Sequence, residues 1–113
     1  MSVTFIPKNP DLTTLQICNG DFETLCQRGV LLAAGLLQVG GWSYFLDDET
    51  SITQLDVSAR DAYAVLRAWQ TYRRAVKDAS VNRREWVHRL DQQLADNDYI
   101  GTFFARCGGF TLQ

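Results

Sequence analysis

Residues 58–79, SARDAYAVLRAWQTYRRAVKDA, predict a long amphipathic helix around which the rest of the chain must pack. Ser58 is a favourable N-cap residue, and Asp61 follows three residues later, where an acid complements the start of a helix. Neither glycine nor proline interrupts this stretch. One face is apolar at three- and four-residue spacing: Val65, Trp69, Tyr72 and Val76. We therefore expect that face to lie against the core.

The opposite face of the same helix is cationic, with no acid from Ala62 to Lys77. Arg60, Arg67 and Arg74 recur every seven residues, so they drift by only about 20° per step and line up along the helix. Ordinary surface helices mix acids with bases to gain pairs between successive turns. We predict a binding face that also takes one cation from the following helix: Arg60, Tyr63, Arg67, Gln70, Arg74, Lys77 and Arg84.

A solvated face is the competing interpretation of these cations. Arg73, Arg74 and Lys77 lie near the negative end of the helix, which is sufficient reason for them to be basic. The remaining cations would then pair with acids of the first half of the chain. In the binding interpretation, Tyr63 lies one turn from Arg67, close enough for a cation–π contact.

A second helix is predicted to begin at Asn82. Glu85 would complete a capping box with Asn82, and Val81 would pack against Trp86 as a hydrophobic staple. The apolar stripe of this helix is narrower than that of the first: Trp86, Val87, Leu90 and Leu94.

Two further helices and several short strands complete the predicted fold. One helix is capped by Asp21 and extends to Val39, although two internal glycines each weaken it by about 1 kcal/mol relative to alanine. The other covers residues 99–107 and ends at Gly108. Strands are expected at residues 3–6, 15–17, 42–46, 51–55 and 110–112, with a surface turn at residues 47–50.

These elements predict an α+β fold. Residues 1–113 are expected to form a single small globular domain in which a few short strands (N-terminal, central and C-terminal) pack with about four helices. The strand at residues 110–112 is expected to pair with the strand at residues 15–17.

Composition and charge limit the classes of protein to consider. The hydrophobic fraction of 46% indicates a chain with a packed core, and the net charge of −2 argues against general nucleic-acid or membrane-surface binding. Residues 1–61 hold eight acids against three cations, whereas residues 62–89 hold seven cations against two acids. An odd number of cysteines and the lack of a signal-peptide pattern favour free thiols and a cytoplasmic location.

Catalytic and metal sites find little support in the sequence. His88, the only histidine, falls on the polar side of its helix near Asp91, where a carboxylate can orient a general base, but solvated histidines are far commoner at such positions. Cys18, Cys26 and Cys107 include no close pair of the kind that structural zinc sites use. We therefore predict no catalytic residue, no metal and no cofactor.

Acids and glycines elsewhere in the chain lead to the same expectation. The consecutive acids at residues 47–49 lack the alternating spacing of a calcium loop, so a solvated turn is the simpler interpretation. The glycine pairs at residues 40–41 and 108–109 lack the spacing of a phosphate-binding loop, and we interpret both as helix stops.

The best supported function is therefore a small, non-enzymatic protein-binding or regulatory module of the adaptor or inhibitor type. Its partner would be another protein with an acidic surface, because Arg and Tyr are over-represented at binding hot spots. The alternative is a nucleic-acid-binding regulator that uses the same face. A small enzyme ranks third, and no membrane association is expected. Homodimerisation through an aromatic surface near Phe103 is compatible with each hypothesis.

Overall fold

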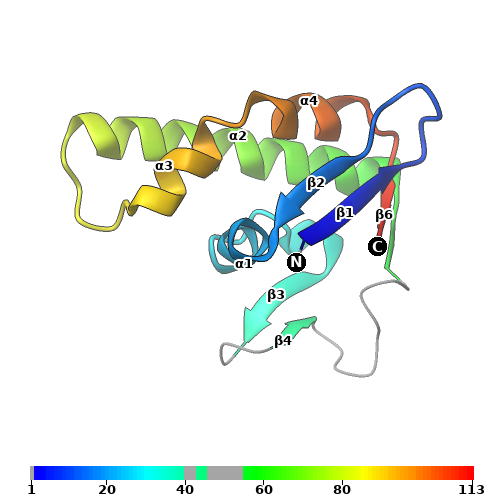
Figure 1. Cartoon of the computed structure of the whole chain (residues 1–113), viewed down its shortest axis with the longest axis horizontal. Helices are drawn as coiled ribbons and strands as arrows, with labels where there is room; N and C mark the ends of the chain where they lie inside the picture. The colour runs from blue at the N-terminus through cyan, green and yellow to red at the C-terminus, as the bar shows by residue number, and fades with distance from the viewer. Residues whose placement is uncertain (1, 40–42, 46–54) are drawn as a thin grey trace.

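The computed structural model describes residues 2–39, 43–45 and 55–113. In these ranges the chain forms a four-stranded antiparallel sheet, a two-stranded ladder and four α-helices. Figure 1 shows the long helix α2 running past the sheet, and α3 and α4 pack beside it. The predicted α+β class is confirmed.

The larger sheet has the strand order β2-β1-β6-β5. Its strands are β1 (Ser2–Pro7), β2 (Leu15–Cys18), β6 (Phe110–Leu112) and β5 (Asp56–Val57). Buried and exposed side chains alternate along β1 and β2, so one face of the sheet lies on the core. Both N-terminal strands and the C-terminal strand are therefore confirmed.

The predicted partner of the C-terminal strand is wrong. β6 pairs with β1, opposite Phe5 and Pro7, and not with residues 15–17. Because β1 and β2 are joined by a short hairpin, β2 occupies one edge of β1 and β6 takes the other. β5 then pairs with the outer edge of β6.

The predicted helix from Asp21 to Val39 is also wrong in its second half. Helix α1 (Asn19–Gln27) is capped by Cys18, whose Sγ accepts the Asp21 N–H at 3.4 Å. Gly29 and Gly35 adopt φ values of 76° and 83°, which end helical structure on each side of a short 3-10 turn, η1 (Leu32–Ala34). The chain then extends into β3 (Leu36–Val39), which pairs with β4 (Ser43–Phe45).

The strands and the turn predicted between residues 42 and 55 are tested only in part. Strand β4 falls within the expected strand at residues 42–46. The turn at residues 47–50, and residues 51–54 of the expected hairpin partner, lie outside the described residues. Leu55 is in no strand.

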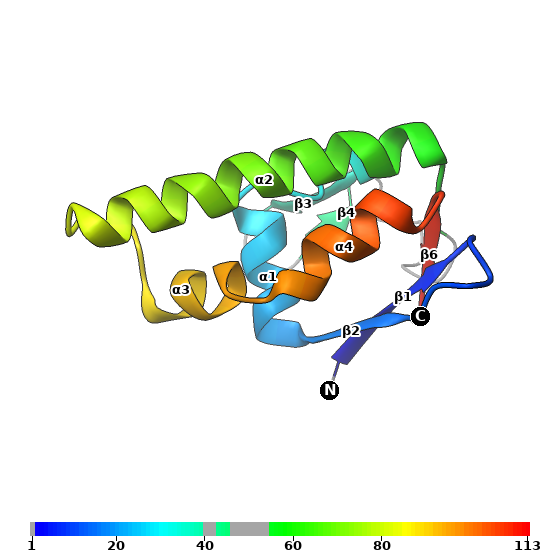
Figure 2. The same ribbon diagram turned by 90° about the horizontal axis from the view of Figure 1, so that it is seen from above.

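Helix α2 (Ala59–Val81) agrees with its prediction. The Ser58 hydroxyl accepts the Asp61 N–H at 3.2 Å and caps the helix. The four apolar side chains expected on the core are all buried: Val65, Trp69, Tyr72 and Val76. The predicted C-terminal helix is confirmed as α4 (Asp98–Arg106), and Figure 2 shows it lying along α2. Gly101 permits this approach, because a Cβ there would lie 3.2 Å from the Trp69 indole nitrogen.

The second predicted helix begins seven residues later than expected. Asn82 ends α2 instead of starting a helix: its side-chain amide donates to the Asp78 carbonyl at 2.9 Å. Arg83 has a φ of 55°, so the helical path cannot continue through it. Residues 82–88 form a loop, and α3 (Arg89–Ala95) follows. Val81 is 82% exposed, which rules out the expected staple with Trp86.

An aromatic cluster joins the sheet to α1 and α4. The Phe5 ring lies 5.2–6.1 Å, between centroids, from four other rings: Phe22, Phe103, Phe104 and Phe110. Phe103 and Phe104 are buried in this cluster, so neither ring is exposed on the surface, and homodimerisation stays a prediction.

Within the described ranges, no helix combines the length and the apolar character that crossing a membrane would require.

Candidate functional site

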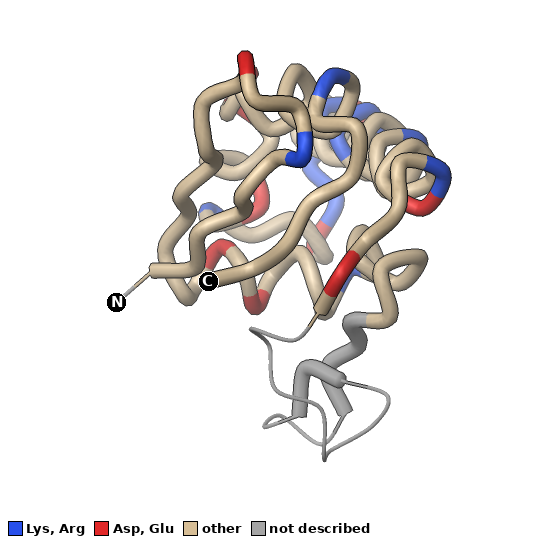
Figure 3. The backbone as a smooth tube through the Cα atoms, turned by 90° about the vertical axis from the view of Figure 1, so that its right-hand side faces the viewer, with Lys and Arg blue, Asp and Glu red and all other residues tan. Residues whose placement is uncertain are grey.

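Six of the seven residues of the predicted binding face lie on α2. All six are exposed, and at 3.6 residues per turn they span an arc of about 100° on the side away from the core: Arg60, Tyr63, Arg67, Gln70, Arg74 and Lys77. We call these six residues the cationic face. Figure 3 shows basic positions recurring along this helix. Arg84 lies beyond the helix end in the 82–88 loop, so the structure does not bring it onto the same helix face.

The cations of this face are not neutralised by acids within the described residues. The ion pairs found there join Lys8 to Asp56, Arg28 to Asp91 and Arg73 to Asp98. Arg73 is therefore used to hold α2 against the start of α4. The other four basic side chains of α2 have no ion-pair partner in this part of the chain: Arg60, Arg67, Arg74 and Lys77.

The expected contact between Tyr63 and Arg67 is not formed. Tyr63 is 61% exposed. The cation–π contact in the described part of the chain instead joins Arg28 to Trp86, with the guanidinium carbon 5.2 Å from the ring centroid.

Two hollows flank the ridge formed by Arg67 and Arg74. One, of about 440 Å³, is lined by polar and basic side chains: Gln70, Arg73, Arg74 and Lys77. The other, of about 490 Å³, lies between α2 and the 82–88 loop and has mainly apolar walls: Arg28, Arg67, Ala68, Thr71, Tyr72, Ala75 and Trp86. We call the second one the Trp86 hollow. Arg67 lines this hollow, so the cationic face continues into it.

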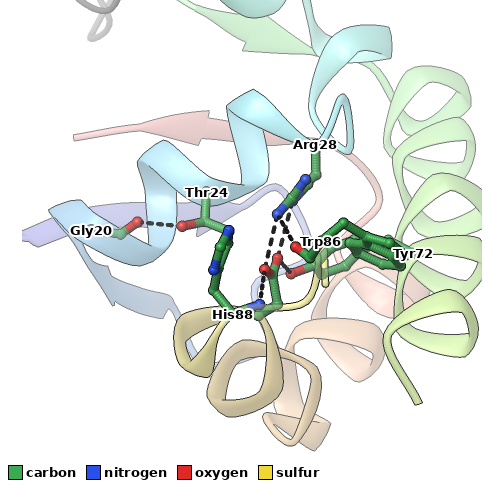
Figure 4. Close-up of polar contacts among 7 residues, drawn as sticks. Gly20, Thr24, Arg28, Tyr72, Trp86 and His88 are labelled. Carbon is green, nitrogen blue, oxygen red and sulfur yellow. Dashed lines mark hydrogen bonds and ion pairs between the residues drawn. The ribbon is translucent and has the colours of Figure 1, made fainter. Parts of the chain in front are cut away.

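Asp91 holds Arg28 in place, and Arg28 is one of the residues that line the Trp86 hollow. Asp91 is 1% exposed, and its carboxylate accepts hydrogen bonds from Arg28 Nε at 3.1 Å and Arg28 Nη2 at 2.9 Å. It also accepts the Tyr72 hydroxyl at 2.6 Å and the His88 backbone N–H at 3.0 Å. Figure 4 shows these groups converging from the C-terminal end of α1, from α2 and from the loop before α3. The expectation that Asp91 lies on a polar, solvated helix face is wrong.

The same contacts set the charge states in this cluster. Burial alone would raise the pKa of the Asp91 carboxyl, but the hydrogen bonds outweigh it and hold that pKa below its usual value of 3.8. Burial, together with the bond to Asp91, raises the pKa of the Tyr72 hydroxyl above its usual value of 10. Asp91 is thus ionised and Tyr72 neutral at pH 7, and the charge of Arg28 is balanced by Asp91.

Arg28 is the residue that connects this cluster to the hollow. Its Nη2 donates to Asp91 and also to the backbone carbonyl of Trp86, at 3.1 Å. Its guanidinium lies against the indole of the same residue. Trp86 therefore stays 40% exposed while its backbone and ring are both held. The sequence carries one weak signal for this arrangement, a lone arginine among acids in the first half of the chain.

Neither the histidine ring nor a cysteine side chain takes part in the hydrogen bonds to Asp91 described above. His88 is exposed and contributes its backbone N–H, not its ring, to the bond with Asp91. Cys18 is exposed, whereas Cys26 and Cys107 are buried. Burial, with a smaller contribution from Glu23, raises the pKa of the Cys26 thiol to about 12. In the described ranges no three His, Cys, Asp or Glu side chains lie together as a metal site would require.

Comparison with protein-family models, with curated proteins and with solved structures gives no significant match to this chain. The function is therefore argued from the cationic face and the Trp86 hollow alone.

Proposed function

We propose that this protein is a non-enzymatic binding module, of the adaptor or inhibitor type, whose cationic face receives an acidic surface of another protein. The observation that carries the proposal is the set of four exposed α2 cations that have no ion-pair partner among the described residues: Arg60, Arg67, Arg74 and Lys77. We place the module in the cytoplasm, in keeping with its three free thiols.

The composition of the face favours a protein partner over a nucleic acid. Arginine, tyrosine and tryptophan dominate binding hot spots, and the cationic face borders a held, half-exposed Trp86. A nucleic-acid surface needs many phosphate contacts, but this chain is acidic overall, and only five of its 11 basic residues lie on α2. An apolar hollow beside the arginines has a use in a protein interface and none in phosphate binding.

The test is an affinity capture from cell extract with two charge-matched variants. Arg67→Glu with Arg74→Glu reverses two charges on the cationic face. Arg89→Glu with Arg106→Glu reverses two exposed charges on α3 and α4 and serves as the control. We expect a partner of the wild type to be retained by the control and lost from the face variant, by at least tenfold.

A second measurement separates the protein partner from the nucleic-acid alternative. On a polyanion column such as heparin, we expect weak retention of the wild type near physiological salt. Tight binding to random DNA or RNA that weakens steeply with salt would establish the alternative. If capture is the same for both variants and the wild type, the face is merely solvated and the proposal fails.

A further inference from the structure

We infer that the segment bound by this module is an acidic amphipathic helix, which lies along α2, places its acids on Arg67 and Arg74, and inserts an apolar side chain into the Trp86 hollow. The inference rests on the proposed function and names the chemistry of the partner. It is supported by the preorganisation of Trp86, by the shape of the opposite wall of the hollow and by the spacing of the cations on α2.

The first support is the preorganisation of Trp86. A buried carboxylate, Asp91, holds Arg28, and Arg28 holds both the carbonyl and the ring of Trp86. Most other side chains of the loop that carries Trp86 are exposed, and Val87 is the one that packs against the core. An exposed aromatic side chain that is already fixed loses little entropy on binding, which is the property of an anchor in an interface.

The second support is the shape of the opposite wall. Apart from Arg67, the side chains that α2 presents to the hollow are small or flat: Ala68, Thr71, Tyr72 and Ala75. A third hollow, lined by Thr71, Arg74, Ala75 and Asp78, continues this surface along α2. Small residues in a row allow a second helix to approach at the usual interaxial distance of about 8–10 Å.

The spacing of the cations points to a helix in particular. Arg67 and Arg74 are seven residues apart, so their Cα atoms are separated by about 10.5 Å along the axis of α2. A partner helix that lies alongside has the same rise per residue, and acids at positions i and i+7 then meet both arginines. Apolar residues at positions i+3 and i+4 fall between the acids on the same face, at the level of the Trp86 hollow. An extended segment would need acids about three residues apart to span the same distance.

The probes are three synthetic peptides that match these alternatives. The first is alanine-rich and helical, with Glu at positions 1 and 8 and Leu at positions 4 and 5. The second has the same composition, with both Glu residues moved to the face opposite the leucines. The third carries its two Glu residues three apart in a sequence with proline, which prevents a helix. Binding to the full ¹⁵N-labelled chain is followed by amide and indole chemical shifts.

We expect the first peptide to change the chemical shifts of the Trp86 indole N–H and of the Ala68 and Ala75 amides. These changes should saturate as the peptide concentration rises. We expect binding of the second and third peptides to be at least tenfold weaker. Equal affinity of the first two peptides, or tighter binding of the third, would overturn the inference.

A matched pair of variants tests the hollow itself. Ala75→Leu fills the hollow without altering charge, and leucine suits an exposed helix position nearly as well as alanine. Ala105→Leu makes the same change at an exposed position of α4 that does not line the hollow. The first peptide should bind the Ala75→Leu variant at least tenfold more weakly than it binds the wild type. Its affinity for the Ala105→Leu variant should equal that for the wild type.

The two proposals fail in different ways. If Arg67→Glu with Arg74→Glu abolishes capture of a cellular partner while Ala75→Leu binds the first peptide like the wild type, the helix inference is wrong and the proposed function stands. If the charge reversal changes neither capture nor peptide binding, both are wrong.

Discussion

Removal of the Asp91 carboxylate by Asp91→Ala should destabilise the protein by about 2–4 kcal/mol. The variant leaves the Tyr72 hydroxyl buried without its acceptor, which costs about 1–3 kcal/mol. It also removes the capping bond to the His88 N–H, worth about 1 kcal/mol. The loss of the ion pair adds less than a fully buried pair would, because the Arg28 side chain is 30% exposed and can regain water.

Urea unfolding of the wild type and four variants measures this effect. Asp96→Ala removes an exposed acid at the end of the same helix and should change the free energy of unfolding by less than about 0.5 kcal/mol. Asp91→Asn keeps the shape of the side chain but removes its charge, and Tyr72→Phe removes one donor. Each should lower the free energy of unfolding by an amount between those of Asp96→Ala and Asp91→Ala. If Asp91→Ala lowers the free energy of unfolding as little as Asp96→Ala does, Asp91 is solvated and the described cluster is wrong.

The pH dependence gives an independent check on the same carboxylate. The folded-state pKa of Asp91 lies below its usual value of 3.8, so the unfolded chain takes up its proton first as the pH falls. The stabilisation is therefore present above about pH 4 and is lost as the pH falls through the folded-state pKa. The stability gap between the wild type and Asp91→Asn should narrow over that range. A gap that stays constant or widens towards low pH would contradict the assigned hydrogen bonds.

Four further outcomes are expected. Trp69→Ala should lower the free energy of unfolding by about 3–5 kcal/mol. The exposed Arg67 is the control, because Arg67→Ala should change it by less than about 0.5 kcal/mol; equal losses would mean that the helix faces are assigned wrongly. Gly109→Ala should cost at least about 2 kcal/mol, because its Cβ would lie 2.5 Å from the Val57 carbonyl oxygen at a φ of 101°; Gly108→Ala, which has open space, should cost less. Cys18 should react with a thiol reagent in the folded protein at pH 8, whereas Cys26, with its pKa raised to about 12, should react only after unfolding. Elemental analysis should find no stoichiometric zinc, and a chelator that melts the fold would contradict the ligand spacing.

The sequence predicts the parts of this fold that depend on local chemistry. The cap at Ser58, the uninterrupted helix and its apolar stripe through Trp69 are all encoded within a few residues of one another, and the structure confirms each. The same holds for strand β1 and for the helix that ends before Gly108. For the candidate site, the six α2 residues are exposed on one arc, as the heptad spacing of the arginines predicts.

The predictions fail where one local sequence pattern is compatible with two structures. Gly29 and Gly35 are compatible with a weakened helix, and only their positive φ values show that the chain turns at both. Asn82 is as suitable at the end of a helix as at its start, and the capping pattern with Glu85 does not distinguish these roles. The partner of β6 depends on which edge of β1 is free, which no property of residues 110–112 can reveal.

The Trp86 hollow could not be predicted because every contact that builds it is long-range. Arg28 and Asp91 are 63 residues apart, and a buried ion pair of this kind leaves no periodic trace in either segment. On the helical wheel Asp91 belongs to the polar side of α3, and the packing of α1 and α2 against α3 buries it.

This division between local and long-range determinants bears on how the proposed site would work. Exposed cations such as Arg67 and Arg74 act through a screened field that speeds association and admits any acidic surface. Selection among acidic partners needs a desolvated contact of defined shape, and the structure offers one beside Trp86, where a guanidinium and a buried carboxylate hold an exposed ring. The α2 arginines would therefore govern how fast a partner arrives, and the Trp86 hollow would govern which partner stays.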